Sequence, residues 1–342
     1  MILSPAALGV AAVMAVVPSL VYLVILNAVD RYEKEPWRIL IASVGLGALA
    51  APLFSVAILA ALGREATLLP QFAPGPGQGD PLVAVVQELV KGALLLALTR
   101  WLRAEFDGVL DGIVYGAAVG AGFAAAESFV FAAGGVATLD GGTIMSLLVA
   151  GLDHAFYTAV VGGVAGAATR ITDTRTRWLA LAHGLATAAL LHAAHDALPA
   201  VTARLFDQPD AALGLVTRVV AQLVNVLGVV TLAGVVWAAW RQEARVLREE
   251  LREEVSAGIV SEDDYASIGS FRHRLARTRA AARSHGLAGV LTLRRLDAAE
   301  GELAFQKRRL AVRRAFRPPE ARTDELRAQI LRLRRRLEEG DR

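Results

Sequence analysis

The chain has 342 residues, of which 55% are hydrophobic and 20% charged, and its mean hydropathy is +0.46. Residues 1–240 carry 12 Lys+Arg and 16 Asp+Glu, whereas residues 241–342 carry 24 and 17. This division excludes a soluble globular enzyme and a secreted disulfide scaffold, because the first part is too apolar and too poorly charged. The absence of cysteine also excludes thiol catalysis and cysteine-ligated zinc. We therefore expect a membrane domain at 1–240 and an Arg/Glu-rich helical tail at 241–342.

Seven stretches are long and apolar enough to cross a bilayer, whose hydrocarbon core of about 30 Å needs about 20 helical residues. They are, approximately, 5–28, 38–62, 81–99, 109–132, 143–168, 178–200 and 212–240. The predicted fold class is all-α: a polytopic membrane helix bundle of about seven transmembrane helices with a helical cytoplasmic C-terminal tail.

The loop charges predict the orientation of these spans. The first, third and fifth loops together carry eight Lys+Arg, and the second, fourth and sixth carry two. Since cytoplasmic loops are enriched in Lys and Arg, the N-terminus is expected outside and the tail in the cytoplasm. Arg outnumbers Lys 33 to 3, which indicates a GC-rich coding bias and a bacterial plasma membrane.

Ionisable side chains occur inside several of the predicted spans. A charge at the bilayer centre costs at least about 2.5–3.5 kcal/mol, so such residues usually serve a function. Near the cytoplasmic ends, Asp111 and His183 are expected to make only local polar contacts. The candidate site residues are Glu88 and Lys91 in the third span, Glu127 in the fourth, His154 in the fifth, and His192 and Asp196 in the sixth.

The depths of these groups predict one buried site. At 1.5 Å per residue, Glu88, Glu127, His192 and Asp196 lie roughly 6–12 Å below the outer edge, and His154 lies near 17 Å. Two carboxylates, a lysine and two imidazoles are suited to activating water. The imidazoles can also stabilise an oxyanion or bind a divalent metal such as zinc. Without cysteine, a metal would have to use His154, His192 and carboxylates.

At these residues the sequence resembles the PrsW family of intramembrane proteases, relatives of the CAAX prenyl proteases. The resemblance covers about residues 15–240. It rests on five motifs: DRYEKEPW (30–37), QELVKG (87–92), FDGVLDGIVYGAAVGAGFAAAES (106–128), DHAFYTAVVG (153–162) and LHAAHD (191–196).

The resemblance implies an intramembrane endopeptidase of the glutamic or metallo type. Its substrates would be single-span membrane proteins, such as anti-sigma factors, cut near the outer face. The implied catalytic residues are Glu88, Glu127, His154, His192 and Asp196, supported by Gln87, Lys91 and Phe123. The family pattern has two adjacent glutamates, and the first is replaced here by Gln87, which cannot accept a proton.

Three functions therefore stay open at this point. The first is proteolysis, with Glu88 or Glu127 as the base. The second is a catalytically silenced relative that binds membrane proteins as a scaffold, because of Gln87. The third is a proton-coupled transporter, against which we find neither an inverted repeat nor paired helix interruptions.

The tail carries basic clusters, RHRLARTR (272–279) and KRRLAVRR (307–314), and a stripe of Leu326, Ile330, Leu333 and Leu337 at helical spacing. A small helical bundle is expected there. Its partners would be anionic lipid or a cytoplasmic protein, and nucleic acid is not expected.

Overall fold

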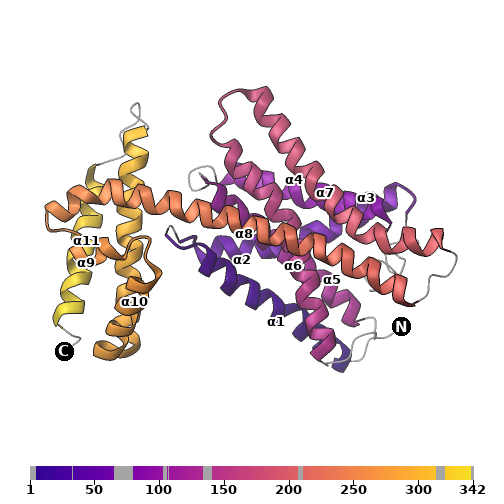
Figure 1. The fold of residues 1–342 in the computed structure, drawn as a ribbon, viewed down its shortest axis with the longest axis horizontal. Helices are drawn as coiled ribbons and strands as arrows, with labels where there is room; N and C mark the ends of the chain where they lie inside the picture. Colours follow the sequence, from indigo (N-terminus) through magenta and orange to yellow (C-terminus); the bar gives the residue numbers. More distant parts are fainter. Residues whose placement is uncertain are drawn as a thin grey trace. The chain divides into compact units, whose positions relative to one another are not determined.

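The computed structural model describes residues 5–32, 34–64, 80–102, 106, 108–133, 141–206, 211–312 and 320–339. These residues form eleven α-helices and one π-helical segment, with no β-strand among them, which confirms the all-α prediction (Figure 1). The chain divides into two compact units. The first comprises Met1–Asp30 and Glu35–Gly234, and the second Arg31–Lys34 and Val235–Arg342.

The first unit contains the apolar helices. They are α1 (Pro5–Val29), α2 (Trp37–Gly45), the π-helical η1 (Leu46–Ala50), α3 (Ala51–Ala61), α4 (Pro81–Trp101), α5 (Val109–Ala133), α6 (Gly141–Ala168), α7 (Thr174–Leu205) and the first part of α8 (Ala211–Ser256). Local signals explain two of the helix starts. The side chains of Asp80 and Asp173 accept hydrogen bonds from backbone N–H groups in the first turns of α4 and α7.

Six helical segments are long and apolar enough to cross a membrane. They are Leu8–Val29, Trp37–Ala61, Pro81–Trp101, Val109–Ala133, Leu148–Ala168 and Ala212–Ser256. The expected count of seven is therefore not confirmed within the described part of the chain. The remaining stretch, 178–200, lies in α7, a continuous helix of 32 residues. This helix is long enough to span, but its three histidines and Asp196 make it more polar than the other six.

Helix α5 lies at the centre of the first unit and packs against α6, α1, α2 and η1. Of its most apolar stretch, 83% is buried, against 17% for the corresponding stretch of α8. Glycines allow α5 and α6 to approach closely. A Cβ atom on Gly112 would lie 1.9 Å from the carbonyl oxygen of Gly162, and one on Gly120 would lie 2.2 Å from that of His154. Small residues thus bring the two backbones together, as packing in lipid requires.

The second unit contains the end of α8 and three further helices, α9 (Glu262–Ser267), α10 (Phe271–Val312) and α11 (Glu320–Glu339). This confirms the helical tail. Helix α10 is kinked at Gly286, whose φ of 58° falls in the left-handed region. The stripe residues Leu326, Ile330 and Leu333 are buried in the apolar core of this unit. Tyr32, from the segment 31–34, belongs to the same core and packs against the guanidinium of Arg274 at 5.1 Å.

A buried network of charges crosses the second unit. Arg277 donates hydrogen bonds to Ser267 and to the carboxylates of Asp264 and Asp297. Glu300 is buried nearby, and its Oε1 atom has no hydrogen-bond partner among the described residues. Burial, followed by the charges of Asp264 and Asp297, raises the pKa of Glu300 well above its ordinary value. The network therefore holds more acidic groups than its basic groups neutralise.

The close approach of α5 and α6 predicts that Gly120→Ala destabilises the first unit. The added methyl would meet backbone atoms of His154 and Ala155, which cannot rotate away. We expect a loss of about 1–3 kcal/mol, measured as a lower melting temperature of the protein in detergent. Gly45→Ala is the matched control, because a Cβ there meets nothing within 4 Å and should leave the melting temperature unchanged. Equal melting temperatures for both variants would contradict the packing described above.

The raised pKa of Glu300 predicts a pH dependence of the second unit. The folded unit keeps a proton on Glu300 that the unfolded chain releases near pH 4.3, about the ordinary glutamate value. The free energy of unfolding should therefore fall as the pH rises from about 4.3 toward the raised pKa. Glu300→Gln should remove this part of the dependence, measured by hydrogen–deuterium exchange of α10 at pH 5 and pH 7.5. Glu262→Gln, the same chemical change at an exposed position of α9, should behave as wild type.

Candidate active site

Helix α4 places an ion pair in the interior of the first unit. Glu88 and Lys91 lie three residues apart, so they share one face of the helix. Both side chains are fully buried, and Lys91 Nζ lies 2.5 Å from Glu88 Oε1. Lys91 Nζ also lies 4.7 Å from the centre of the Phe123 ring on α5. A buried charge needs partners of this kind, and the sequence supplies them one helical turn away and on the neighbouring helix.

Helix α7 adds His192 to this pair. Its Nδ1 atom lies 2.8 Å from Glu88 Oε1, and its Nε2 atom lies 3.4 Å from Asp196 Oδ2 one turn later. The imidazole is thus held between two carboxylates, one from α4 and one from its own helix. His195 follows on the same helix, with its Nδ1 atom 3.1 Å from Asp196 Oδ1.

Helix α6 contributes His154, which joins the remaining groups. Its Nδ1 atom lies 3.2 Å from Lys91 Nζ, and its Nε2 atom lies 2.5 Å from Glu127 Oε2 on α5. His154 thus contacts one residue of α4 and one of α5. The contact of Gly120 with the backbone of His154 explains how α6 comes so close to α5.

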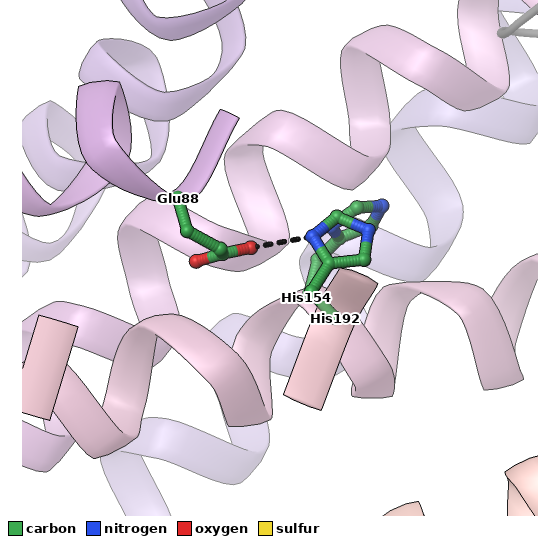
Figure 2. Close-up of side chains that lie close together, drawn as sticks. All are labelled: Glu88, His154 and His192. Carbon is green, nitrogen blue, oxygen red and sulfur yellow. Dashed lines mark hydrogen bonds and ion pairs between the residues drawn. The ribbon is translucent and has the colours of Figure 1, made fainter. Parts of the chain in front are cut away.

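Three of these side chains have the composition of a metal site. One ligand atom each from Glu88, His154 and His192 lies within 4.8 Å of the others. Figure 2 shows the Glu88 carboxylate pointing toward the two imidazole rings. The second oxygen of Glu88, Oε2, is buried and has no hydrogen-bond partner among the described residues. Because zinc commonly takes two histidines and one carboxylate, this donor set fits a divalent metal.

Exposure separates the carboxylates of the cluster. The Glu88 side chain is fully buried, whereas that of Glu127 is 21% exposed and that of Asp196 is 34% exposed. Glu127 and Asp196 therefore lie at the margin of the cluster, while Glu88 lies in its interior. The arrangement combines a buried donor set with a partly exposed carboxylate hydrogen-bonded to one of its imidazoles. Such an arrangement can bind a reacting group and accept a proton from water.

Other residues singled out from the sequence lie apart from this cluster. Asp111 accepts a hydrogen bond from the backbone N–H of Gly108 at the start of α5, and His183 is exposed on α7. Glu35, from the first motif, accepts a hydrogen bond from Tyr115, about 18 Å along α5 from Glu127 at 1.5 Å per residue. Gln87 is buried on α4, but the contacts with Lys91 and His192 are made by Glu88.

Two polar groups next to the cluster were not predicted as site residues. The ring of Tyr157 stacks on that of His192, with centroids 4.8 Å apart and an angle of 16° between the planes. Asn225, on α8, donates a hydrogen bond to the Tyr157 hydroxyl at 2.6 Å. A usable signal was present for each: Tyr157 follows His154 by three residues, and Asn225 is a polar residue within an apolar span.

Comparison with known proteins identifies one family. A family model described as "PrsW family intramembrane metalloprotease" matches residues 35–236, which is more than half of the chain and includes every residue of the cluster. Neither a curated protein nor a solved structure matches the chain.

The ion pair predicts that single substitutions are more harmful than the double substitution. Lys91→Met leaves the buried Glu88 carboxylate without its cation, which should cost about 3–5 kcal/mol of stability. The double variant Glu88→Gln/Lys91→Met removes both charges and should recover most of that loss. Melting temperatures of wild type and the two variants in detergent test this. A double variant as unstable as Lys91→Met would show that charge pairing is not what stabilises this part of the bundle.

Proposed function

The chain belongs to the PrsW family of intramembrane metalloproteases, and we propose that Glu127 activates water for the cleavage of single-span membrane proteins near the outer face. The observation that carries this proposal is the 2.5 Å contact between the partly exposed Glu127 and His154 of the buried cluster. A base must reach both solvent and the reacting bond, and Glu127 combines some exposure with a fixed orientation.

Each of these residues has one role in the proposed hydrolysis. Glu127 takes a proton from water, and the oxygen adds to the carbonyl carbon of the scissile bond. The carbon–nitrogen bond then breaks, and the proton passes from Glu127 to the departing amine. General base catalysis of this kind contributes about 10²–10⁴ to the rate. His154 orients the Glu127 carboxylate, and Asp196 orients His192.

Glu88, His154 and His192 would hold a divalent metal, with zinc the best fit to two imidazoles and one carboxylate. When bound there, the metal would supply Lewis-acid polarisation of a carbonyl oxygen or of water. Lys91 balances the Glu88 charge in the apolar interior. The sequence-based prediction gave His154, His192 and carboxylates in general, and the present proposal names Glu88 as the carboxylate.

The position of the site along the helices supports cleavage near the outer face. Glu88 lies seven residues after the start of α4, and Glu127 lies six residues before the end of α5. The loop charges orient α4 inward and α5 outward, so both carboxylates lie in the outer half of the bilayer. An anti-sigma factor with one span is a substrate of the right kind, because its scissile bond would lie at that depth. The protein would reside in a bacterial plasma membrane with its tail in the cytoplasm.

A silenced scaffold is the second candidate, and Gln87 is the residue that favours it. Gln87 cannot act as a base, so the function of the first family glutamate would be lost if it were essential. The contacts of the cluster argue for proteolysis, because they use Glu88 and Glu127, which are both present.

New protein N-termini in membranes of cells that carry wild type, Glu127→Gln or Gln87→Glu distinguish the two candidates. Under the protease proposal, termini present with wild type disappear with Glu127→Gln, a loss of at least about 10²-fold in rate. Those termini would also identify the substrates. Termini that appear only with Gln87→Glu would instead support the silenced scaffold.

Two controls complete this experiment. Glu249→Gln makes the same chemical change at an exposed position of α8 and should leave the termini as in wild type. Treatment with 1,10-phenanthroline tests the metal separately, because chelation should abolish the termini only if the metal takes part. Cleavage that persists unchanged in Glu127→Gln would exclude Glu127 as the base.

A further inference from the structure

Few side chains of helix α8 point toward the active site. Most of its membrane portion faces outward, and its most apolar stretch is only 17% buried. Some of the residues that are not exposed recur at intervals of three or four and so share one face of the helix, among them Thr217, Ala221, Asn225 and Gly228. Asn225 is the polar residue of this stripe with the deepest burial, at 1% exposed. A buried amide without partners is unfavourable, and the Oδ1 atom of Asn225 has none among the described residues, so the contacts of its Nδ2 atom are informative.

The Nδ2 atom of Asn225 donates a hydrogen bond to the Tyr157 hydroxyl on α6, at 2.6 Å. The two helices come close enough for this contact because α8 has a glycine one turn later. A Cβ atom on Gly228 would lie 2.3 Å from the ring of Phe156. Tyr157 is itself 1% exposed, so its hydroxyl has little access to solvent. The Asn225 amide therefore holds the hydroxyl end of the Tyr157 side chain, which limits how far the ring can swing away from its neighbours.

The tyrosine ring in turn covers one face of His192. The two rings are nearly parallel, at 16°, with centroids 4.8 Å apart. The His154 ring stands edge-on to the same imidazole at 85° and 5.0 Å. Glu88 and Asp196 contact the two ring nitrogens of His192, and Tyr157 covers one face of the ring. Rotation of the Tyr157 ring would remove the only stacked aromatic contact that the described residues give to His192.

We propose that Asn225 is a positioning residue of this enzyme, which acts through Tyr157 to hold the His192 imidazole in the plane that the reaction requires. This inference rests on the proposed function of the cluster. It assigns to α8 a part in the active site that it plays without touching substrate. Groups that orient a metal-binding histidine typically contribute 10–100-fold to metal affinity or activity.

Cobalt(II) is the probe, because its visible absorption reports the histidine ligands without any substrate. The purified full-length protein in detergent is titrated with Co²⁺ as wild type, Asn225→Leu, Tyr157→Phe and the double variant. We expect each single variant to bind Co²⁺ about tenfold more weakly, with a changed visible spectrum. The double variant should be no weaker than the singles, because both changes break the same hydrogen bond. Melting temperatures are recorded alongside to show whether each variant folds. If Asn225→Leu does not fold, the Co²⁺ affinity of Tyr157→Phe, which keeps the ring, is the test.

Two control variants separate the possible outcomes. Thr231→Val changes a polar residue of similar size on the exposed side of α8 and should bind Co²⁺ as wild type does. His192→Ala should abolish the spectrum. If Asn225→Leu and Tyr157→Phe match wild type while His192→Ala does not bind, the proposal is overturned.

A second readout keeps this test separate from that of the proposed function. The variants are compared by the rate at which wild-type-dependent N-termini accumulate in membranes, which should fall about tenfold in Asn225→Leu. Termini unaffected by Glu127→Gln would overturn the role of Glu127 as base but leave the Co²⁺ result for Asn225 standing. If His192→Ala retains the Co²⁺ spectrum, the N-termini alone decide, and an Asn225→Leu rate equal to that of wild type overturns the proposal.

Discussion

The buried ion pair between Glu88 and Lys91 is the constraint on which the rest of the first unit depends. Two opposite charges with no exposed surface are tolerated inside an apolar bundle only when they are paired and further hydrogen-bonded. His192 adds a contact at Oε1 of the carboxylate and His154 adds one at the ammonium group, while Glu88 Oε2 has no partner among the described residues. Those contacts require α4, α6 and α7 to meet at one level. The position of the site therefore depends on how these three helices pack, and their packing depends on the contacts within the site.

Small residues allow the helices to pack this closely. The glycines of α5 let α6 approach until their backbones touch, and the contact at Gly120 is with the backbone of His154 itself. In lipid no hydrophobic effect drives helices together, so close packing and polar contacts must hold the bundle. Here close packing and polar contacts act at the same place. The glycines of α5 allow α6 to approach, and the hydrogen bond between His154 and Glu127 joins α6 to α5. Packing and proposed chemistry thus depend on the same residues.

The second unit is stabilised by different interactions from those of the first unit. Its helices have an apolar core of leucine and isoleucine, and its buried charges are arranged around arginines such as Arg277 and Arg327. The charges of Arg277 and Arg334 do not compensate for the burial of Glu300 and its acidic neighbours, which gives this unit a pH dependence of its own. The short segment 31–34 contributes Tyr32 to the core, so a loop that leaves α1 is part of the folded tail.

Local sequence was sufficient to predict the helices, the tail and the identity of the polar residues in the spans. Composition and periodicity report whether each side chain prefers lipid or water, and that preference is a property of the residue and its near neighbours. Six of the seven expected spans are confirmed as long, apolar helices, and the seventh, in α7, is not confirmed because its histidines and Asp196 make it more polar. The same reasoning paired Glu88 with Lys91, which are neighbours on one helix, and it listed the histidines. It did not predict that His154 contacts Glu127, or that Asn225 reaches His192 through Tyr157. Those contacts join residues up to 68 positions apart in the sequence. Only the tertiary structure decides them, because they depend on how closely whole helices approach one another and on the angle at which they cross.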